Sequence, residues 1–387
     1  ANVLTELDES VRERVIEQLG LSHVANVVSD LEADDVIEIV EELDYAEREE
    51  VLDALSDDDR SMVEEGLSYP EDSAGRLMQR SVVDMPSHWS VGQAIDFLRE
   101  ADDLPRDFYD IFLVDPNQRP LGAIPLSRIL ATRRHVALNA LMIADLKLIP
   151  VDMDQEEVAY LFRQRDLISA PVIDDTRRLV GVITVDDIVD VIHEEHEEDI
   201  MRLGGVGEED DLFAAVLDTA RSRFIWLLVH LAAAILGAAV INHFSGTIEQ
   251  MVAMAVLMPI VAAMGGTASV QTLTVAVRAI AMRELTPANA LRTIGKEIVV
   301  GMVNGLLFAV IIGGVAWGWF GNPALGGVIA LAIVINFLVA GLAGSALPVY
   351  LQRFGFDPAV ASSALLTSIT DVLGFYVFLA LGTWLLL

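Results

Sequence analysis

The pattern of hydrophobic and polar positions divides the chain into two halves at about residue 212. Beyond this point apolar residues form five runs, each longer than the roughly 20 residues that a helix needs to cross a bilayer. The runs lie at 224–244, 252–280, 298–320, 325–351 and 359–387. Before this point apolar residues recur only at short helical or strand spacing. The sequence therefore predicts a multi-domain chain, with a soluble half followed by an all-α transmembrane pore domain at 223–387.

The first 67 residues repeat a short acidic helical unit. In each unit, residues that favour a helix N-terminus precede apolar residues three or four positions apart. The expected helices are Val11–Leu19, Val36–Leu43, Glu47–Leu55 and Arg60–Leu67. Neighbouring helices bury each other's apolar stripes, so we expect an α-helical, superhelical N-terminal domain at 1–67. Because Ala1 begins within the pattern, we expect this domain to be trimmed at its start.

Two α/β repeats follow, at 68–135 and 136–193, in which short β-rich segments alternate with helices. The second repeat matches the first in order and in local sequence. The matching segments are Phe112–Asp115 with Pro171–Asp174, and Leu121–Ile124 with Val180–Ile183. A further strand is expected at Ser81–Val83 of the first repeat.

A carboxylate-rich segment at 194–222 connects the repeats to the first apolar run, and Gly204–Gly207 interrupts its helical pattern. Such a charge run is most often a solvated face. Packed like charges also repel, however, and divalent cations between them would draw the segments together. The segment is therefore a candidate cation sensor. His193 and His196 suit zinc by spacing, but nothing specifies a third ligand.

The distribution of charged residues also divides the chain at about residue 212. Of the 387 residues, positions 1–211 hold 52 acidic and 18 basic side chains, a net charge of −34, whereas the remainder holds 6 acidic and 7 basic ones. This acidity argues against nucleic acid, which needs clustered Lys and Arg. It favours cation partners, a saline cytoplasm, or both. The chain has no Cys, and no nucleophile–base pair is evident, so we expect no enzyme.

The last apolar run contains one acid, Asp371, after Asp357. A carboxylate inside a bilayer is costly and normally faces water or a partner. Ser363 and Thr367 precede Asp371 at four-residue spacing, which places the three oxygens on one helix face. Such a stripe suits a hard cation such as Mg²⁺. The alternative is an Asp with a structural role, whose hydrogen bond to a neighbouring helix holds the two helices together.

The second run is interrupted by Pro259, Gly265 and Gly266, and the third and fourth runs carry Asn304 and Asn336. Breaks of this kind are tolerated where a water-filled path or neighbouring helices satisfy the backbone. These residues are therefore candidate neighbours of the pore or filter. Close helix packing through small residues explains the glycines equally well, and either Asn could be interhelical glue.

Orientation follows from the basic residues, which favour the cytoplasmic side. They flank the start of the first run and the second loop, whereas the first and third loops have none. These residues are Arg221, Arg223, Arg278, Arg283, Arg292 and Lys296. We expect a multi-pass protein of the plasma (inner) membrane, with a cytoplasmic N-terminal half and the C-terminus outside.

The segment Gly181–Asp187 resembles the strand-to-helix motif of cystathionine-β-synthase (CBS) domains. In relatives that bind adenine nucleotides, the Thr and Asp of this motif meet ribose and phosphate. The resemblance implies a tandem CBS pair, with Thr184 and Asp187 as possible nucleotide ligands and ATP as a possible cofactor. The first repeat lacks both residues.

The order of domains resembles that of the MgtE family of magnesium channels over essentially the whole chain. The specific stretches are Tyr69–Met78, Glu198–Ile200, Gly265–Gly266, Arg353–Ala359 and Thr370–Val372. The resemblance implies a homodimer with a central pore, lined by Asp371 with Ser363 and Thr367. It also implies regulatory Mg²⁺ sites at Asp154, Glu156, Asp166, Asp187, Glu195, Glu198 and Asp199. Two positions depart from the family pattern, Thr267 after the paired glycines and Ala364 after Ser363.

The expected function is a Mg²⁺-selective channel that imports Mg²⁺ and is closed by cytosolic Mg²⁺ bound to the N-terminal domain, the CBS pair and the connecting (plug) helix. The alternative is a carrier or exchanger for divalent cations, including Co²⁺ or Zn²⁺. A third interpretation is a nucleotide sensor with a membrane anchor, against which the polar stripe at Asp371 argues.

Overall fold

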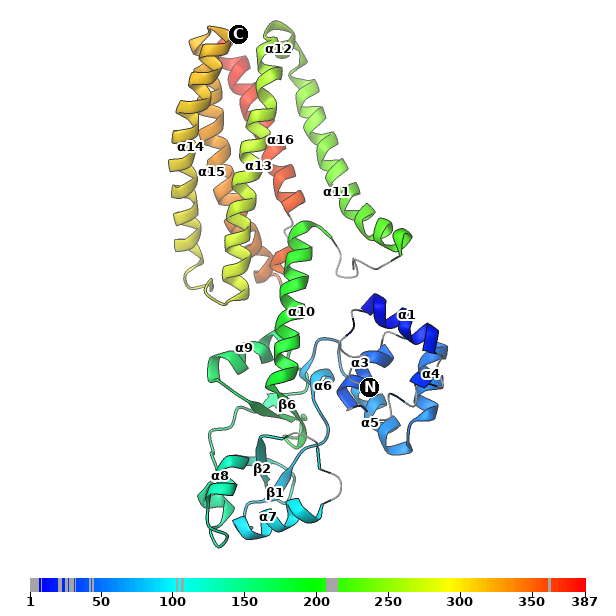
Figure 1. Cartoon of the computed structure of the whole chain (residues 1–387). Coiled ribbons are helices and arrows are strands. Elements are labelled where there is room, and N and C mark those ends of the chain that lie inside the picture. The colour runs from blue at the N-terminus through cyan, green and yellow to red at the C-terminus, as the bar shows by residue number, and fades with distance from the viewer. Residues whose placement is uncertain are drawn as a thin grey trace. The chain divides into compact units, whose positions relative to one another are not determined.

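The fold is taken from a computed structural model of the chain (Figure 1). It describes residues 7, 9–19, 23, 24, 27, 31, 33–41, 43, 45–101, 104, 105, 108–206, 215–360 and 363–387. The chain forms two compact units, Ala1–His196 and Glu197–Leu387, and each is described by itself. Helix α10 (Val185–Gly204) contributes its first half to one unit and its second half to the other.

Short helices form the first part of unit 1, as the repeated acidic pattern predicts. They are α1 (Glu9–Leu19), α3 (Ala33–Glu41), α4 (Tyr45–Ala54) and α5 (Asp57–Leu67). Their apolar stripes meet in one core that includes Ile16, Ile37, Val40, Val51 and Val63. The burial of these stripes is the main stabilising contribution, since isolated helices of this length are marginal in water.

Two three-stranded sheets with the same topology form the rest of unit 1, which confirms the CBS pair. The strands are β1 (Asp84–Pro86), β2 (Asp110–Val114), β3 (Pro120–Pro125), β4 (Ile149–Pro150), β5 (Ser169–Ile173) and β6 (Leu179–Thr184). In each sheet the first pair is parallel and the second antiparallel. The helices are α6 (Ala74–Leu77), α7 (Val91–Glu100), α8 (Leu126–Ala131), the 3-10 helix η1 (Leu138–Ala140) and α9 (Gln155–Arg165).

The strand expected at Ser81–Val83 is wrong, because the strand begins at Asp84. The backbone a few residues before Asp84 pairs with the second repeat instead. Gln79 forms an isolated bridge with Val182 of the second repeat, with N···O distances of 2.8 and 2.9 Å. The chain thus joins the second sheet before it enters the first, and local β propensity cannot show this exchange.

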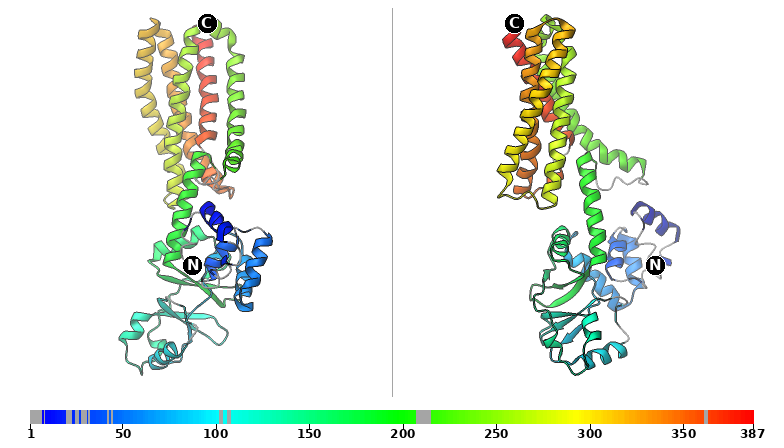
Figure 2. Two further views of the ribbon diagram at one scale, coloured as in Figure 1. Left: turned by 45° about the vertical axis from the view of Figure 1, so that its right-hand side comes forward. Right: turned by 60° about the vertical axis from the view of Figure 1, so that its left-hand side comes forward.

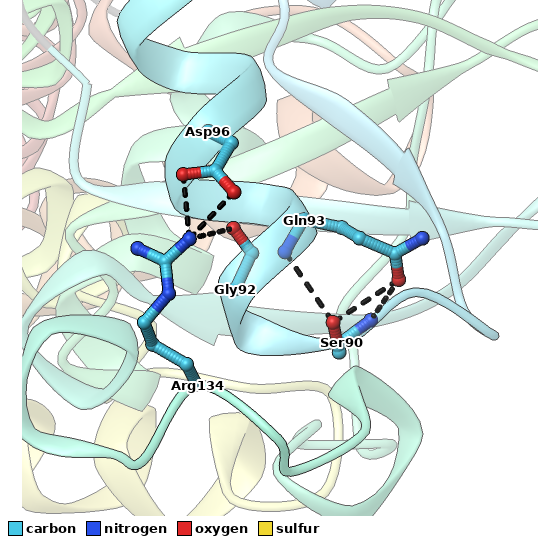
Figure 3. Close-up of polar contacts among 5 residues, drawn as sticks. All are labelled: Ser90, Gly92, Gln93, Asp96 and Arg134. Carbon is cyan, nitrogen blue, oxygen red and sulfur yellow. Dashed lines mark hydrogen bonds and ion pairs between the residues drawn. The ribbon is translucent and has the colours of Figure 1, made fainter.

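Helix α7 is fixed at both its start and its first turns (Figure 3). Ser90 and Gln93 form a capping box, in which Ser90 Oγ accepts from Gln93 N at 3.3 Å and Gln93 Oε1 accepts from Ser90 N at 2.9 Å. Arg134 donates to Gly92 O at 3.2 Å and to both Asp96 carboxylate oxygens, at 2.6 and 2.5 Å. These contacts hold the helix to the segment that follows α8.

Unit 2 contains, among the described residues, five helices long and apolar enough to cross a membrane. They belong to α11 (Val216–His243), α13 (Val252–Ala281), α14 (Ala290–Phe320), α15 (Pro323–Arg353) and α16 (Ser363–Leu386). Two short elements accompany them, α12 (Ser245–Gln250) and the 3-10 helix η2 (Pro358–Val360). The five-helix transmembrane part is confirmed.

Three of these helices, α13, α15 and α16, pack against one another around a core that includes Leu257, Val261, Ile333, Phe337 and Phe378. Helix α16 also packs against α11, and it lies between α11 and α13 in Figure 1 and in the left view of Figure 2. Helix α14 packs chiefly on α15, and the two run side by side in both figures. Much of the outer surface of α11 and α14 is apolar and exposed, as lipid or a partner requires.

Glycines bring the backbones of α14 and α15 into direct contact. A Cβ added at Gly326 would lie 2.7 Å from Gly313 O, and one added at Gly313 would lie 2.9 Å from Gly326 O. The same holds further along the pair, away from the loop that joins the two helices, where a Cβ at Gly301 would lie 2.6 Å from Phe337 O and one at Gly341 would lie 2.7 Å from Glu297 O. No side chain fits at these points without moving a backbone.

We therefore expect Gly326→Ala to destabilise unit 2 by about 1 to 3 kcal/mol, because the added methyl overpacks the contact. Gly314→Ala is the matched control, since a Cβ at Gly314 has no atom within 4 Å and Ala is the better helix former. Thermal unfolding of the full chain in detergent measures both. Equal melting temperatures for the two variants would contradict the close approach.

Candidate functional site

Asp371 lies in the first half of α16, in the part of the helix that packs between α11 and α13. Its side chain is half-buried, and none of the described residues donates a hydrogen bond to its carboxylate. A packing role as interhelical glue requires such a donor. The carboxylate is therefore available to a ligand that supplies positive charge.

Gly266 of α13 faces this carboxylate. A Cβ added at Gly266 would lie 3.2 Å from Thr367 Cγ2 and 4.0 Å from Asp371 Oδ1. The structure thus brings together three of the residues singled out from the sequence, and the absence of a side chain at Gly266 lets α13 approach Thr367 and Asp371 closely. Ser363 begins α16 two turns earlier on the same face, whereas Ser362 lies outside the described residues.

Gly265 serves close packing instead. A Cβ added there would lie 2.1 Å from Asn336 Nδ2, so the Asn336 side chain occupies its place. Asn336 is 2% exposed and donates from Nδ2 to Val261 O at 2.9 Å, which ties α15 to α13. Pro259 lies on the exposed side of α13, and Asn304 lies on the exposed side of α14. The structure does not bring Asn304 to Asp371.

A polar stripe, hereafter the α13 stripe, runs along the exposed side of α13. It consists of Thr267, Gln271, Thr274 and Arg278, all exposed and spaced four, three and four residues apart. Polar side chains do not face lipid at this depth without a partner or water. The spacing was visible in the sequence, but burial of the opposite face was needed to show that the stripe is exposed.

Sequence reasoning missed His230 of α11. Its Nδ1 lies 3.0 Å from Ser368 Oγ on α16, three residues before Asp371. The available signal was an ionisable residue inside an apolar run, the same signal that identified Asp371.

The end of α10 is attached to the start of α16 within unit 2. Arg202 forms ion pairs with Glu198, one helical turn earlier, and with Asp357, which directly precedes η2. Leu203 packs in an apolar cluster that includes Leu273, Ala359 and Leu366. These contacts hold the end of α10 to the residues just before the Asp371 helix.

The acids expected to bind regulatory Mg²⁺ take separate positions. Asp154 caps α9 by accepting from Glu156 N at 2.9 Å, and Asp166 ends the same helix in the left-handed conformation, with φ of 52°. Glu195 accepts from Gln155 at 3.0 Å. Glu198 and Asp199 lie near the end of α10. Within the described ranges, no three His, Asp or Glu side chains converge to hold a metal ion.

The Asp187 carboxylate is bonded by Thr184 of its own repeat and by Gln79, the residue that bridges to the second sheet. Its carboxylate accepts from Thr184 N at 3.0 Å, from Thr184 Oγ1 at 2.9 Å and from Gln79 Nε2 at 3.4 Å. Burial raises the pKa of Asp187 to about 6, although the Thr184 bonds oppose this shift. The group acts mainly as a cap for α10.

A small cavity of about 20 Å³ lies beside Thr184 between the two repeats. Tyr109, Phe108 and Phe112 supply aromatic walls, and Asp110 accepts from Ser169 Oγ at 2.6 Å. Thr184 therefore faces a pocket, as a nucleotide ligand must, whereas Asp187 does not line it.

The Asp187 shift predicts a pH dependence. Because the pKa in the fold is about 6 and the ordinary value is 3.8, the contribution of this group to stability is greatest below pH 3.8 and is lost as the pH rises through 6. The Asn side chain in Asp187→Asn does not ionise, so this variant does not lose stability as the pH rises through 6. We expect its unfolding free energy, relative to wild type, to increase by about 2 to 3 kcal/mol between about pH 4 and pH 7.5.

Thermal unfolding of the full chain in detergent at the two pH values tests this prediction. Asp190→Asn is the control, because Asp190 lies on the same helix and is exposed. A difference between Asp187→Asn and wild type that does not change with pH would contradict the raised pKa.

Comparison with known proteins agrees with this architecture. Residues 258–381 match the family model MgtE, described as a divalent cation transporter, residues 1–72 match the MgtE intracellular N domain, and residues 138–194 match the CBS domain. The magnesium transporter MgtE of Thermus thermophilus is 32% identical over 82% of this chain and 71% of its own length. That of Bacillus subtilis is 28% identical over 82% of this chain and 70% of its own length.

Among solved structures, the cytosolic domain of the Mg²⁺ channel MgtE in complex with ATP is 30% identical and covers 49% of this chain and 78% of that one, with a TM-score of 0.47. The five membrane-spanning helices and the matched transporter region define a multi-pass membrane transporter of divalent cations. The chain belongs to the MgtE family of magnesium transporters, and Mg²⁺ is its transported ion.

Proposed function

We propose that this protein is a Mg²⁺ channel of the plasma membrane, with its N-terminal half in the cytoplasm, and that cytosolic Mg²⁺ closes it. The observation that carries the proposal is Asp371, a carboxylate with no hydrogen-bond donor among the described residues, beside Thr367 and close to the backbone of α13 at Gly266. One carboxylate and nearby hydroxyls suit an ion that keeps most of its water shell.

The α13 stripe supports a homodimer with a shared pore. A single copy leaves Thr267 and Gln271 exposed in the span that also carries Gly266. A second copy that places this face against a water-filled path would satisfy these groups, and a lipid environment would not. In such a pore each copy contributes one Asp371.

The charge of the soluble half supports gating by Mg²⁺. With a net charge of −34 over residues 1–211, the cytoplasmic domains repel one another unless cations neutralise them. We propose that Asp154, Glu156, Asp166, Glu195, Glu198 and Asp199 supply these sites, with ions bridging domains or copies. Asp187 contributes less, because its carboxylate already accepts three hydrogen bonds. The attachment of Arg202 to Asp357 carries the change to α16.

Patch recording with Mg²⁺ as the only permeant cation tests the channel and its gating together. We expect unitary current at near-zero cytoplasmic Mg²⁺ that disappears at millimolar Mg²⁺. Saturating flux without unitary current would instead favour a carrier or exchanger for divalent cations, including Co²⁺ or Zn²⁺. Current that persists at millimolar Mg²⁺ would leave the pore intact and reject the acidic sensor.

We further propose that an adenine nucleotide such as ATP binds beside Thr184, where the small cavity between the two repeats would widen to admit it. Aromatic side chains suit the base, and the Asp110 carboxylate suits the ribose hydroxyls. Calorimetric titration of ATP into wild type and Asp110→Ala measures this directly, with at least about tenfold weaker binding expected for the variant. Equal affinities would place any nucleotide elsewhere.

A further inference from the structure

The contact between His230 and Ser368 fixes the chemical state of the imidazole. Ser368 Oγ lies 2.7 Å from Ala364 O and donates its single hydrogen to that carbonyl. The same oxygen must therefore accept from His230 Nδ1, 3.0 Å away. In the neutral ring the lone pair is then on Nε2. A hydrogen bond that holds one ring nitrogen and leaves the other available is the usual arrangement of a metal-binding His.

His230 lies on the side of α11 that faces the Asp371 helix. Seven residues later on the same side, a Cβ added at Gly237 would lie 3.8 Å from Val372 Cγ2 and 3.7 Å from Phe375 Cδ2 of α16. Helices α11 and α16 thus run in the same direction, with contacts at Ser368 and again at Val372. Asp371 lies between these two contacts along α16, one helical turn after Ser368.

On α11 the position between the contacts is Ala233, which shares the face of His230 and Gly237 at three- and four-residue spacing. Its side chain is small. The local donor set is then one imidazole nitrogen, one carboxylate and the hydroxyls of α16, with water for the remaining positions.

This donor set differs from the one that Mg²⁺ requires. Mg²⁺ is bound by oxygen and water, whereas Ni²⁺ and Co²⁺ prefer sites that include imidazole nitrogen. We propose that His230 and Asp371 form a binding site for divalent transition-metal ions such as Ni²⁺, which compete with Mg²⁺ at Asp371. The proposal rests on the proposed function, because it takes Asp371 as a ligand of the transported ion.

The test measures Mg²⁺ uptake by the full chain in vesicles of phosphatidylethanolamine and phosphatidylglycerol, with Ni²⁺ as the competing ion. For each variant, the Ni²⁺ concentration that halves uptake is divided by the Mg²⁺ concentration that half-saturates uptake. We expect this ratio to increase about tenfold or more in His230→Gln. His243→Gln is the matched control, because His243 ends the same helix and its ring packs against Phe244, and we expect its ratio to equal that of wild type.

An unchanged ratio in His230→Gln would overturn the proposal and leave His230 as an interhelical contact. Should His230→Gln fail to fold, Ser368→Ala replaces it, since this variant keeps the imidazole and removes only the group that orients it. A raised ratio in Ser368→Ala supports the site, and an unchanged one rejects it.

Calorimetric titration of Ni²⁺ into the detergent-solubilised protein separates this proposal from the proposed function. Loss of Mg²⁺ uptake in Asp371→Asn, together with wild-type Ni²⁺ affinity in His230→Gln, rejects only the transition-metal site. Full Mg²⁺ uptake in Asp371→Asn rejects Asp371 as a ligand of the transported ion. If the Ni²⁺ affinity then falls in His230→Gln but not in Asp371→Asn, the proposal that the two residues share one site is also rejected.

Discussion

Replacing Asp371 by Asn should reduce Mg²⁺ flux at least about a hundredfold. Asn keeps the shape of the side chain and removes its charge, and an amide oxygen attracts a hydrated divalent cation much less than a carboxylate does. Because no described residue donates to the carboxylate, the substitution takes an acceptor away from none of them, and we expect the fold to be retained. The measurement is unitary current, or Mg²⁺ uptake in vesicles, normalised to the amount of folded protein.

Glu249→Gln is the matched control, because it makes the same carboxylate-to-amide change on the short helix α12 of the same unit. We expect wild-type flux from this variant. Wild-type flux from Asp371→Asn would remove the central observation on which the channel proposal depends. Loss of flux in both variants would point to a general effect of charge and not to a local ligand.

Replacing Arg202 by Ala should raise the cytoplasmic Mg²⁺ concentration that half-closes the channel by about tenfold. Arg202 links Glu198 of α10 to Asp357 ahead of α16, and all three side chains are partly shielded from water. Without these ion pairs, α10 is no longer held to the residues ahead of α16. The coupling free energy lost is that of a partly buried charged pair, about 1.5 to 3 kcal/mol. The measurement is open probability against cytoplasmic Mg²⁺ in excised patches.

A charge exchange sharpens this test. Arg202→Asp and Asp357→Arg should each weaken closure, and the double variant should recover part of it, because the pair is restored in reverse. Arg221→Ala, at the exposed start of α11, is the control and should close as wild type does. Additive defects in the double variant would show that the two residues act independently.

The sequence was sufficient for most of the fold because the strongest signals are local. Apolar runs longer than a bilayer is thick, and acidic helices with regular apolar spacing, do not depend on distant contacts. The start of β1 was misplaced because Gln79 pairs with Val182 about a hundred residues away. Pairing at that distance has no local signal.

The candidate site followed from the sequence only where a residue is unusual by itself. Asp371 is conspicuous in an apolar run, and its four-residue spacing to Thr367 fixes their shared face. The roles of adjacent Gly265 and Gly266 are indistinguishable in sequence, yet one packs on Asn336 and the other faces Thr367 and Asp371. His230 needed the packing of α11 on α16, since nothing in its own run indicates Ser368 as its partner.

The backbone contact between α14 and α15 also limits which parts of the protein can move. Sliding one helix along the other would carry Val334 or Trp317 side chains into places where only glycine fits, as at Gly305 and Gly326. We therefore expect the pair to move as one body and the opening motion to involve α11, which packs on α16 and α12. Spectroscopic labels on α14 and α15 should keep a constant separation through the gating cycle, whereas a label on α11 should move relative to both.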